Sequence, residues 1–336
     1  MTFTFDESQR PLMGSSDSPQ SSGLSPDEAF ALLGNEIRMN VLRHLGQEGG
    51  PMSFSELRDA VEVDDPGQFN YHLDRLVGHF VQRTGDGYEL RRPGQRMIEA
   101  VLSGAVTEAP NLERTELSWS CMYCGSTPVE IEYRKEQLGV YCTECPGSYG
   151  SPETDEDALP EQRQRLFYNN LPPAGLQGRS AEDLLITSMH WSSIEVMHLS
   201  VGVCPRCSAS VERDYKACKD HDPSEGICDS CERRLGVLLQ YVCTNCLFEA
   251  RTILGMGFAA NIRLMDFIRG HGYNPIAPVS SQVYEMIFTY DEEIISIDPL
   301  NVEVTFSLGG DEITFHVDEA LDTLGESDPY RRGLQP

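Results

Sequence analysis

The chain has 336 residues, of which 53 are acidic and 26 are basic, and its formal net charge is −27. This length supports two or three domains with separate hydrophobic cores. No apolar run reaches the roughly 18 residues of a membrane helix, and the N-terminus lacks a charged start and an apolar signal core. We therefore predict a soluble cytoplasmic protein with no membrane partner.

The basic residues are almost all arginines, because Lys occurs only at Lys135, Lys216 and Lys219. Negative charge is spread over the whole chain instead of one tail, and a high, self-repelling net charge is a device of halophilic proteins. We interpret the composition as an adaptation to a salt-rich cytoplasm. The alternative, an acidic protein that avoids nucleic acid, remains open.

Residues 1–24 are rich in Ser, Pro, Asp and Gly and show no apolar period, so they are predicted to form a disordered tail. After Ser25, Pro26 occupies a first helical position and the pattern predicts one amphipathic helix that ends at Gly49. Its apolar positions are Phe30, Leu33, Ile37, Val41, Leu42 and Leu45.

Further elements follow in close order. Ser53 and Glu56 form a capping box that begins a second helix, and Pro66 begins a third helix that ends before Gly78. Two short strands, 80–83 and 88–91, flank a Gly-bearing turn, and a last helix covers about 94–102. This order predicts a winged helix-turn-helix over residues 25–105.

Ala29 to Gly104 resemble the winged helix-turn-helix of ArsR-type transcriptional regulators of the haloarchaeal kind, in the segments LLGNEIRMNVLRHL, SFSELRDAV, QFNYHLDRLVGHFV and GDGYELRRPGQRM. The resemblance implies a DNA-binding, usually dimeric regulator whose third helix enters the major groove. It does not extend to metal sensing in this module, because no cysteine precedes Cys121. The expected partners are double-stranded DNA and a second copy of the chain.

The third helix offers polar side chains outside its apolar stripe of Phe69, Leu73 and Leu76. Gln and Asn pair with adenine and Arg with guanine, whereas arginines near the wing suit phosphates. The candidate DNA-binding residues are Gln68, Asn70, Tyr71, His72, Arg75, Arg83, Arg91 and Arg92. Nearby Asp64, Asp65 and Asp74 oppose this role, so a winged helix that binds only protein stays an alternative.

All eleven cysteines belong to half-sites with a two-residue gap, and His221 completes the half-site of Cys218. Such a gap lets a tight turn present two donors to one tetrahedral ion, so twelve ligands predict three structural Zn²⁺ ions. The candidate ligands are Cys121, Cys124, Cys142, Cys145, Cys204, Cys207, Cys218, His221, Cys228, Cys231, Cys243 and Cys246.

The first two half-sites are separated by 17 residues that include the alternating segment VEIEYR. This spacing predicts a zinc ribbon on a three-stranded hairpin over residues 115–150, in preference to a thioredoxin-like redox pair.

Pairing within residues 201–255 is ambiguous, because the four half-sites are separated by 10, 6 and 11 residues. Sequential pairing gives two small ribbons, and alternate pairing gives a cross-brace. A third option places one ion between Cys204, Cys207, Cys243 and Cys246 and leaves the inner four residues as core or redox groups. We favour two ions, with His221 as the weakest ligand.

The remaining segments are less specific. Residues 151–200 are predicted to form an acidic linker and a helix from Ser180 to Leu199, and the segments LPPAGLQGR, GVCPRC and CTNC resemble a zinc-containing region appended to such modules in haloarchaeal proteins. Residues 256–324 are predicted to contain a helix over 257–270 and strands over 283–290, 302–308 and 312–317, and 325–336 a loose tail.

The expected fold is therefore α+β and multidomain: a winged helix-turn-helix, zinc-ribbon modules and a small C-terminal antiparallel sheet with helices. No phosphate-binding loop, nucleophile elbow or HExxH motif is present, and four-ligand sites leave no open metal position, so we expect no enzymatic activity. A DNA-binding regulator is the favoured function. The alternatives are a scaffold that contacts transcription proteins and, less favoured, a thiol oxidoreductase.

Overall fold

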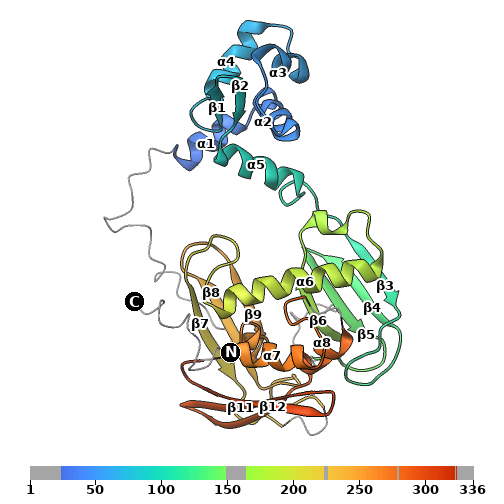
Figure 1. Cartoon of the computed structure of the whole chain (residues 1–336). Helices are drawn as coiled ribbons and strands as arrows, with labels where there is room; N and C mark the ends of the chain where they lie inside the picture. The colour runs from blue at the N-terminus through green and yellow to red at the C-terminus, as the bar shows by residue number, and fades with distance from the viewer. Residues whose placement is uncertain (1–23, 149–163, 223–225, 278–279, 322, 324–336) are drawn as a thin grey trace. The chain divides into compact units, whose positions relative to one another are not determined.

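The computed structural model describes residues 24–148, 164–222, 226–277, 280–321 and 323, and it has a mixed α+β architecture with several small antiparallel sheets (Figure 1). The chain divides into two units, residues 1–108 and 109–336. The predicted disordered tail over residues 1–24 lies outside the described ranges except for Leu24, and so do the acidic stretch over residues 151–161 and the predicted loose tail.

The first unit consists of five helices and one hairpin within its described part. The elements are α1 (Pro26–Leu33), α2 (Glu36–Glu48), α3 (Phe54–Val61), α4 (Pro66–Leu76), β1 (Val81–Thr84), β2 (Gly87–Leu90) and α5 (Arg92–Leu102). The prediction of one helix from Ser25 to Gly49 was wrong. Gly34 caps the C-terminus of α1, and the Asn35 side chain accepts a hydrogen bond from the Arg38 N–H to begin α2.

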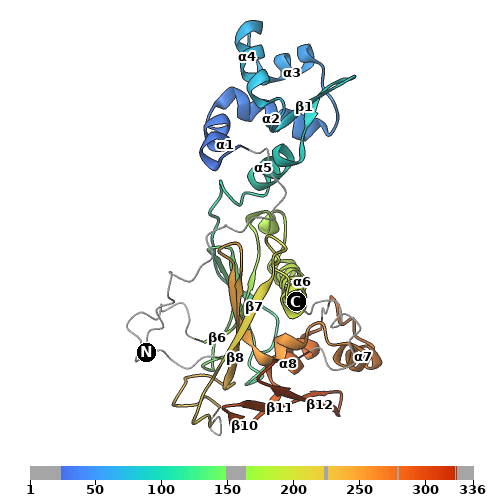
Figure 2. The ribbon, with the colours of Figure 1, turned by 90° about the vertical axis from the view of Figure 1, so that its left-hand side faces the viewer.

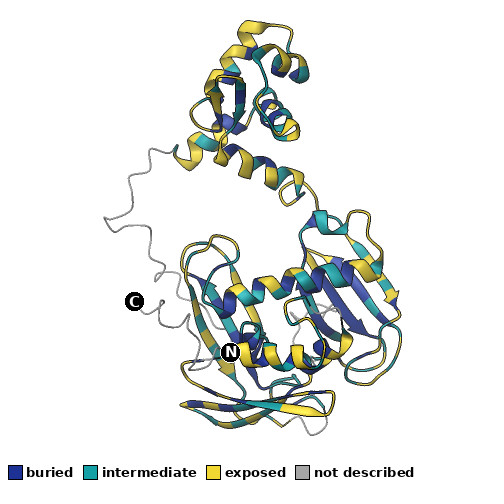
Figure 3. Ribbon diagram, viewed as in Figure 1, coloured by how far each residue is buried: buried dark blue, intermediate teal, exposed yellow. Residues whose placement is uncertain are grey.

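Local capping signals fix the other helix starts in this unit. The capping box predicted at Ser53 and Glu56 is present at α3, and the Asp65 carboxylate caps α4 by accepting from the N–H groups of Gly67 and Gln68. The core lies between α2, α3, α4 and the hairpin, and Figure 3 shows buried positions on the inner faces of these elements. Its fully buried members include Val41, Leu42, Leu57, Phe69, Leu73 and Leu76.

The second unit contains three antiparallel sheets, with strand orders β3-β4-β5-β6, β7-β8-β9 and β10-β11-β12. The strands are β3 (Leu112–Leu117), β4 (Val129–Arg134), β5 (Gln137–Cys142), β6 (Arg165–Asn170), β7 (Val211–Ala217), β8 (Val237–Cys243), β9 (Glu249–Ile253), β10 (Asp291–Ile297), β11 (Leu300–Leu308) and β12 (Asp311–Asp318). The helices are η3 (Pro173–Leu176), α6 (Ala181–Ser200), η4 (Leu254–Phe258), α7 (Ile262–Gly270) and α8 (Ser281–Phe288).

Several sequence predictions need correction here. The segment 283–290 is not a strand: Ser280 caps α8, and Val283, Tyr284 and Met286 are buried on that helix. The missing strand is β10, which begins at Asp291. The helix predicted from residue 257 begins at Ile262, after the 3₁₀ turn η4. A short apolar run fits a buried helix and a strand equally well, so periodicity alone misassigned it.

The long helix α6 packs on the four-stranded sheet (Figures 1 and 2). It also contacts η4. Leu184, Leu185 and Met189 of α6 are buried against strands β4, β5 and β6. The β4–β5 hairpin is thus flanked by β3 on one edge and β6 on the other, so the sheet has four strands where three were predicted. A second core joins β7-β8-β9 with η4, α7, α8 and the C-terminal sheet.

Among the described residues, none of the helices combines the length and apolarity that a bilayer crossing requires.

Candidate metal centres and nucleic-acid interface

Twelve side chains form three groups that are suited to metal binding. The first group contains Cys121, Cys124, Cys142 and Cys145, the second Cys204, Cys207, Cys243 and Cys246, and the third Cys218, His221, Cys228 and Cys231. In each group the four ligand atoms lie within 4.8 Å of one another. All predicted ligands are therefore brought together, His221 included.

Pairing in the second half of the chain is nested. The outer two half-sites form one group and the inner two form another, so the sequential and alternate pairings were both wrong. The outer group agrees with the third option, but the inner four residues are not left over as core or redox groups. The preference for two four-ligand groups in this region is confirmed.

Strand register explains the nesting. Val211 pairs with Cys243 at one end of the β7–β8 ladder, and Ala217 pairs with Val237 at the other. The half-site before β7 therefore lies next to the half-site after β8. The two half-sites in the connection between β7 and β8 lie next to each other at the opposite end of the ladder. The six steps from Val211 to Ala217, at about 3.3 Å each, separate the two groups by about 20 Å. The first group repeats the outer arrangement, with Val129 opposite Cys142.

Sulfur separations match those of a tetrahedral thiolate site. Cys121–Cys145 and Cys204–Cys246 are 3.7 Å apart, Cys124–Cys142 3.6 Å and Cys207–Cys243 3.5 Å. A tetrahedron with Zn–S bonds of about 2.3 Å has edges of about 3.8 Å. A disulfide requires about 2.05 Å, and all eleven cysteines are free. The donor set fits a thiolate-preferring metal, and it fills four positions.

Backbone N–H groups prepare the sulfurs for this role. The N–H groups of Glu144 and Cys145 both donate to Cys142 Sγ at 3.3 Å. Although burial opposes it, hydrogen bonds lower the pKa of Cys142 to about 6. The pKa of Cys207 is also lowered to about 6, chiefly by the Ala209 N–H, whereas burial raises the pKa of Cys204. Four crowded thiols cannot all ionise alone, so a cation is needed to stabilise the set.

His221 is oriented toward the third group by a contact on its other ring nitrogen. Its Nδ1 lies 3.5 Å from Cys231 Sγ, and its Nε2 lies 3.2 Å from the carbonyl oxygen of Arg234. An Nε2–H that donates to a carbonyl leaves Nδ1 free as a ligand, a common arrangement at metal sites. Gly236 provides the room for this ring, because a Cβ there would lie 2.7 Å from His221 Cγ.

The predicted DNA-contact residues divide into two sides of α4. Gln68, Tyr71 and Arg75 follow a spacing of three and four residues, and all are exposed, Tyr71 by 57%. Asn70 lies on the other side, where its amide donates to Asp74 at 2.8 Å. The face opposite to both contains the buried Phe69, Leu73 and Leu76.

His72 lies on α4 between the exposed side of Gln68, Tyr71 and Arg75 and the buried face, and it is half-buried. Burial first, and the nearby Arg38 second, lower the pKa of His72. Arg38 Nη1 is 3.3 Å from His72 Nδ1, so the neutral ring accepts there and presents Nε2–H as a donor.

The remaining predicted arginines lie near the hairpin. Arg83 is exposed on β1 with its guanidinium 5.7 Å from the Tyr88 ring centroid. Arg91 is the N-cap residue of α5, and Arg92 contacts Gln95 at 3.2 Å and Glu99 at 3.7 Å. Only Arg83 of these three belongs to the hairpin strands.

A family model described as a domain of unknown function, DUF7351, matches residues 118–323, more than half of the 336 residues. The chain belongs to the DUF7351 family. A second model, also described as a domain of unknown function (DUF7347), matches residues 26–101. No curated protein and no solved structure matches the chain. The DUF7351 match includes all twelve candidate ligands, whereas the DUF7347 match includes the candidate DNA-contact residues.

Sequence reasoning missed two contacts that connect the metal groups of the DUF7351 region to each other and to α6. The Arg234 guanidinium lies 4.1 Å from the ring centroid of Tyr123, in the first knuckle, and its Nε donates to the Gly147 carbonyl at 2.6 Å. Arg206, between Cys204 and Cys207, forms an ion pair with Glu195 of α6 at 3.0 Å. The only feature of the sequence that could have indicated these contacts is position, because Arg206 lies inside a half-site and Arg234 lies just after one.

Proposed function

We propose that this DUF7351-family chain is a DNA-binding transcriptional regulator whose first unit is a winged helix-turn-helix and whose second unit is stabilised by zinc. The observation that carries the proposal is the exposed stripe of Gln68, Tyr71 and Arg75 on α4. A helix that buries one face in a small core and exposes a polar face without tertiary partners is suited to a groove. The proposal also rests on the ArsR-type resemblance of residues 29–104.

The stripe has the chemistry of direct readout. Gln68 is suited to adenine and Arg75 to guanine in the major groove, and Tyr71 adds apolar contact and a hydroxyl. His72 would donate from Nε2, while Arg83, Arg91 and Arg92 would contact phosphates. Asn70 contributes to base contact only after it leaves Asp74. At high salt, counterion release contributes less, so hydrogen bonds and apolar contacts carry more of the affinity.

Zinc is the proposed metal at all three groups, in a structural role. Cys₄ and Cys₃His sets with two-residue gaps are typical of structural zinc, and four protein donors leave no position for a reactive water. The first group is then a zinc ribbon, and the β7–β8 hairpin carries one zinc at each end. The zinc ions hold the hairpin ends, and we propose no catalytic role for them.

A homodimer in a reducing cytoplasm completes the proposal. ArsR-type regulators are usually dimeric, and α5 exposes Leu102 by 54% near the end of the first unit. Free thiols at eleven positions suit a reducing compartment. Light scattering of the full chain in molar KCl should give twice the mass of one chain, whereas a monomer at micromolar concentration would contradict this part of the proposal.

The function is tested by capture of fragmented genomic DNA on the zinc-loaded full chain in molar KCl. We expect recovery of a small set of fragments that share a short palindromic sequence. The triple variant Gln68→Ala, Tyr71→Ala and Arg75→Ala should recover none of them while it retains zinc and helicity. Equal recovery of all fragments, or of none, by the unmodified chain would contradict sequence-specific binding.

A scaffold that contacts transcription proteins is the second candidate. The acidic side chains around α4 favour it, because Asp64, Asp65 and Asp74 are all exposed near the proposed DNA face. Co-purification of transcription proteins in the absence of DNA enrichment would support this candidate. A thiol oxidoreductase is less favoured, and it requires zinc release and disulfide formation at low peroxide concentration.

A further inference from the structure

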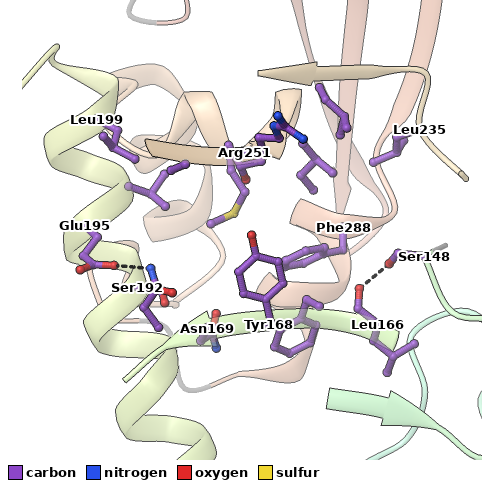
Figure 4. Close-up of a pocket in the computed structure, with 18 of the residues that line it drawn as sticks. Ser148, Leu166, Tyr168, Asn169, Ser192, Glu195, Leu199, Leu235, Arg251 and Phe288 are labelled. Carbon is purple, nitrogen blue, oxygen red and sulfur yellow. Dashed lines mark hydrogen bonds between the residues drawn. The ribbon is translucent and has the colours of Figure 1, made fainter. Parts of the chain in front are cut away.

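A cavity of about 110 Å³ lies inside the second unit, where the four-stranded sheet, α6 and the β7–β8–β9 sheet meet. Figure 4 shows Ser192, Glu195 and Leu199 extending into it from α6, with Leu235 on the opposite side. The lining is mainly apolar and includes Leu166, Phe167, Val196, Leu238, Ala250 and Phe288. Its charged members are Glu195, Arg233, Arg234 and Arg251. All of these residues belong to one unit.

The walls of the cavity are built by the metal groups. Tyr123 lies between Cys121 and Cys124 of the first group, and Arg234, which follows Cys231 of the third group, packs on its ring at 4.1 Å. The positions of these two lining residues therefore depend on the first and third metal groups. Glu195 forms an ion pair with Arg206, which lies between Cys204 and Cys207 of the second group, so that group fixes the position of the carboxylate. A cavity whose walls are fixed by three separate structural centres is preformed, which lowers the cost of binding a ligand.

Glu195 gives the cavity a buried acceptor, the only carboxylate in the described part of its lining. Its side chain is on a residue that is 6% exposed, and Oε2 accepts a hydrogen bond from Asn170 Nδ2 at 3.0 Å. Oε1 lies 3.0 Å from Arg206 Nη2 but has no donor in hydrogen-bonding geometry among the described residues. A buried carboxylate oxygen is stabilised when a donor completes its shell. The ion pair offsets the charge, so the ligand need not be a cation.

The size of the cavity limits the ligand. An enclosed apolar protein cavity of about 150 Å³ holds benzene. The present cavity, of about 110 Å³, is smaller but partly open to solvent, so it limits the ligand to a single ring that lies partly in the opening. We propose that the cavity is a binding site for a single-ring aromatic molecule that carries one hydrogen-bond donor, with the ring against Phe167, Phe288 and Val196 and the donor on Glu195 Oε1. This site is independent of the DNA-binding proposal.

The test compares three probes of equal ring size on the zinc-loaded full chain in molar KCl: phenol, which has a donor, toluene, which has none, and benzoate, which is an anion. Binding is measured by saturation-transfer NMR and titration. We expect phenol to bind more tightly than toluene by about tenfold, the ratio typical of a hydrogen bond to a charged group. Benzoate should bind less tightly than phenol, because its carboxylate has no donor for Glu195 Oε1. Tighter binding of benzoate than of phenol would assign the polar contact to the lining arginines and overturn the proposal.

Two variants fill the cavity from opposite walls, Val196→Phe on α6 and Ala250→Phe on β9. Each should weaken phenol binding at least about tenfold by occupying the ring position. Ile194→Phe is the matched control, because Ile194 is on the same helix but 51% exposed. Zinc content and the melting temperature identify a variant that has not folded. In that case, phenol binding to the other filling variant provides the test.

Glu195→Gln separates the polar contact from the cavity shape. It should reduce the preference for phenol over toluene to about threefold or less, because a neutral acceptor is weaker than a carboxylate. The proposal is overturned if phenol shows no saturable binding, or if every folded filling variant binds phenol as tightly as the Ile194→Phe control. Equal affinity for the three probes would overturn the role of Glu195.

Discussion

Val211 lies directly opposite Cys243 in the β7–β8 ladder, and this pairing determines which cysteines lie in the same candidate metal group. In an antiparallel pair, the segment that precedes the first strand lies next to the segment that follows the second strand. The half-site that precedes β7 must therefore meet the one that follows β8, and the two half-sites between the strands must meet each other. The spacing of the cysteines alone does not distinguish this arrangement from the other two.

Nested pairing predicts the zinc content of double cysteine variants. Cys207→Ser with Cys246→Ser removes two ligands from one group, so the chain should retain two of three zinc ions by elemental analysis. Sequential or alternate pairing would place these cysteines in different groups and leave one zinc. The control pair, Cys207→Ser with Cys228→Ser, should leave one zinc, since nested pairing assigns its members to different groups. A content near one in the first variant would contradict the nested pairing.

The two sides of α4 should respond differently to mutation. Arg75→Ala should weaken binding to the captured DNA by about 1–3 kcal/mol and relax specificity at one base position, as expected for a bidentate Arg–guanine contact. Asn70→Ala should have a much smaller effect, because the Asn70 amide is bonded to Asp74. Gel-shift titrations at fixed salt measure both. A larger loss for Asn70→Ala would place the contact surface on the other side of the helix.

His72 should titrate below the ordinary histidine value. Burial, and then Arg38, lower the pKa of His72 in the folded chain. Because the unfolded chain then binds the proton more readily, the free energy of unfolding should fall as the pH falls from about 6.5 through the folded-state pKa. NMR titration of the imidazole checks the direction of the shift. Arg38→Gln should raise the pKa only in part, since burial is the larger cause, and a value above 6.5 in the unmodified chain would contradict the assignment.

Gly236 should be required for the third metal group. A Cβ there would lie 2.7 Å from His221 Cγ and 2.7 Å from Ile294 Cδ1, so Gly236→Ala should displace the imidazole. We expect one zinc of three to be released to a chelator at least about tenfold faster, as for the loss of a supporting contact at a metal site. Gly270→Ala is the control, because a Cβ there meets no described atom within 4 Å. Identical release from the two variants would show that His221 is not a ligand.

Residue type and short-range spacing were sufficient to predict the local elements. The capping box at Ser53 and Glu56, the buried stripe of α4 and all twelve ligands follow from contacts within a few residues along the chain. The donor chemistry of a CxxC gap is equally local. For this reason the α+β class and the metal-binding capacity were accessible from the amino-acid sequence.

Only the tertiary structure decided how distant segments combine. The nested ligand groups depend on strand register, and α8 is a helix because Val283, Tyr284 and Met286 are buried at helical spacing in a packed unit. The cavity beside Glu195 exists because α6 spans both cores. These features arise from contacts between residues far apart in sequence, and no local pattern encodes which of several equally spaced partners will meet.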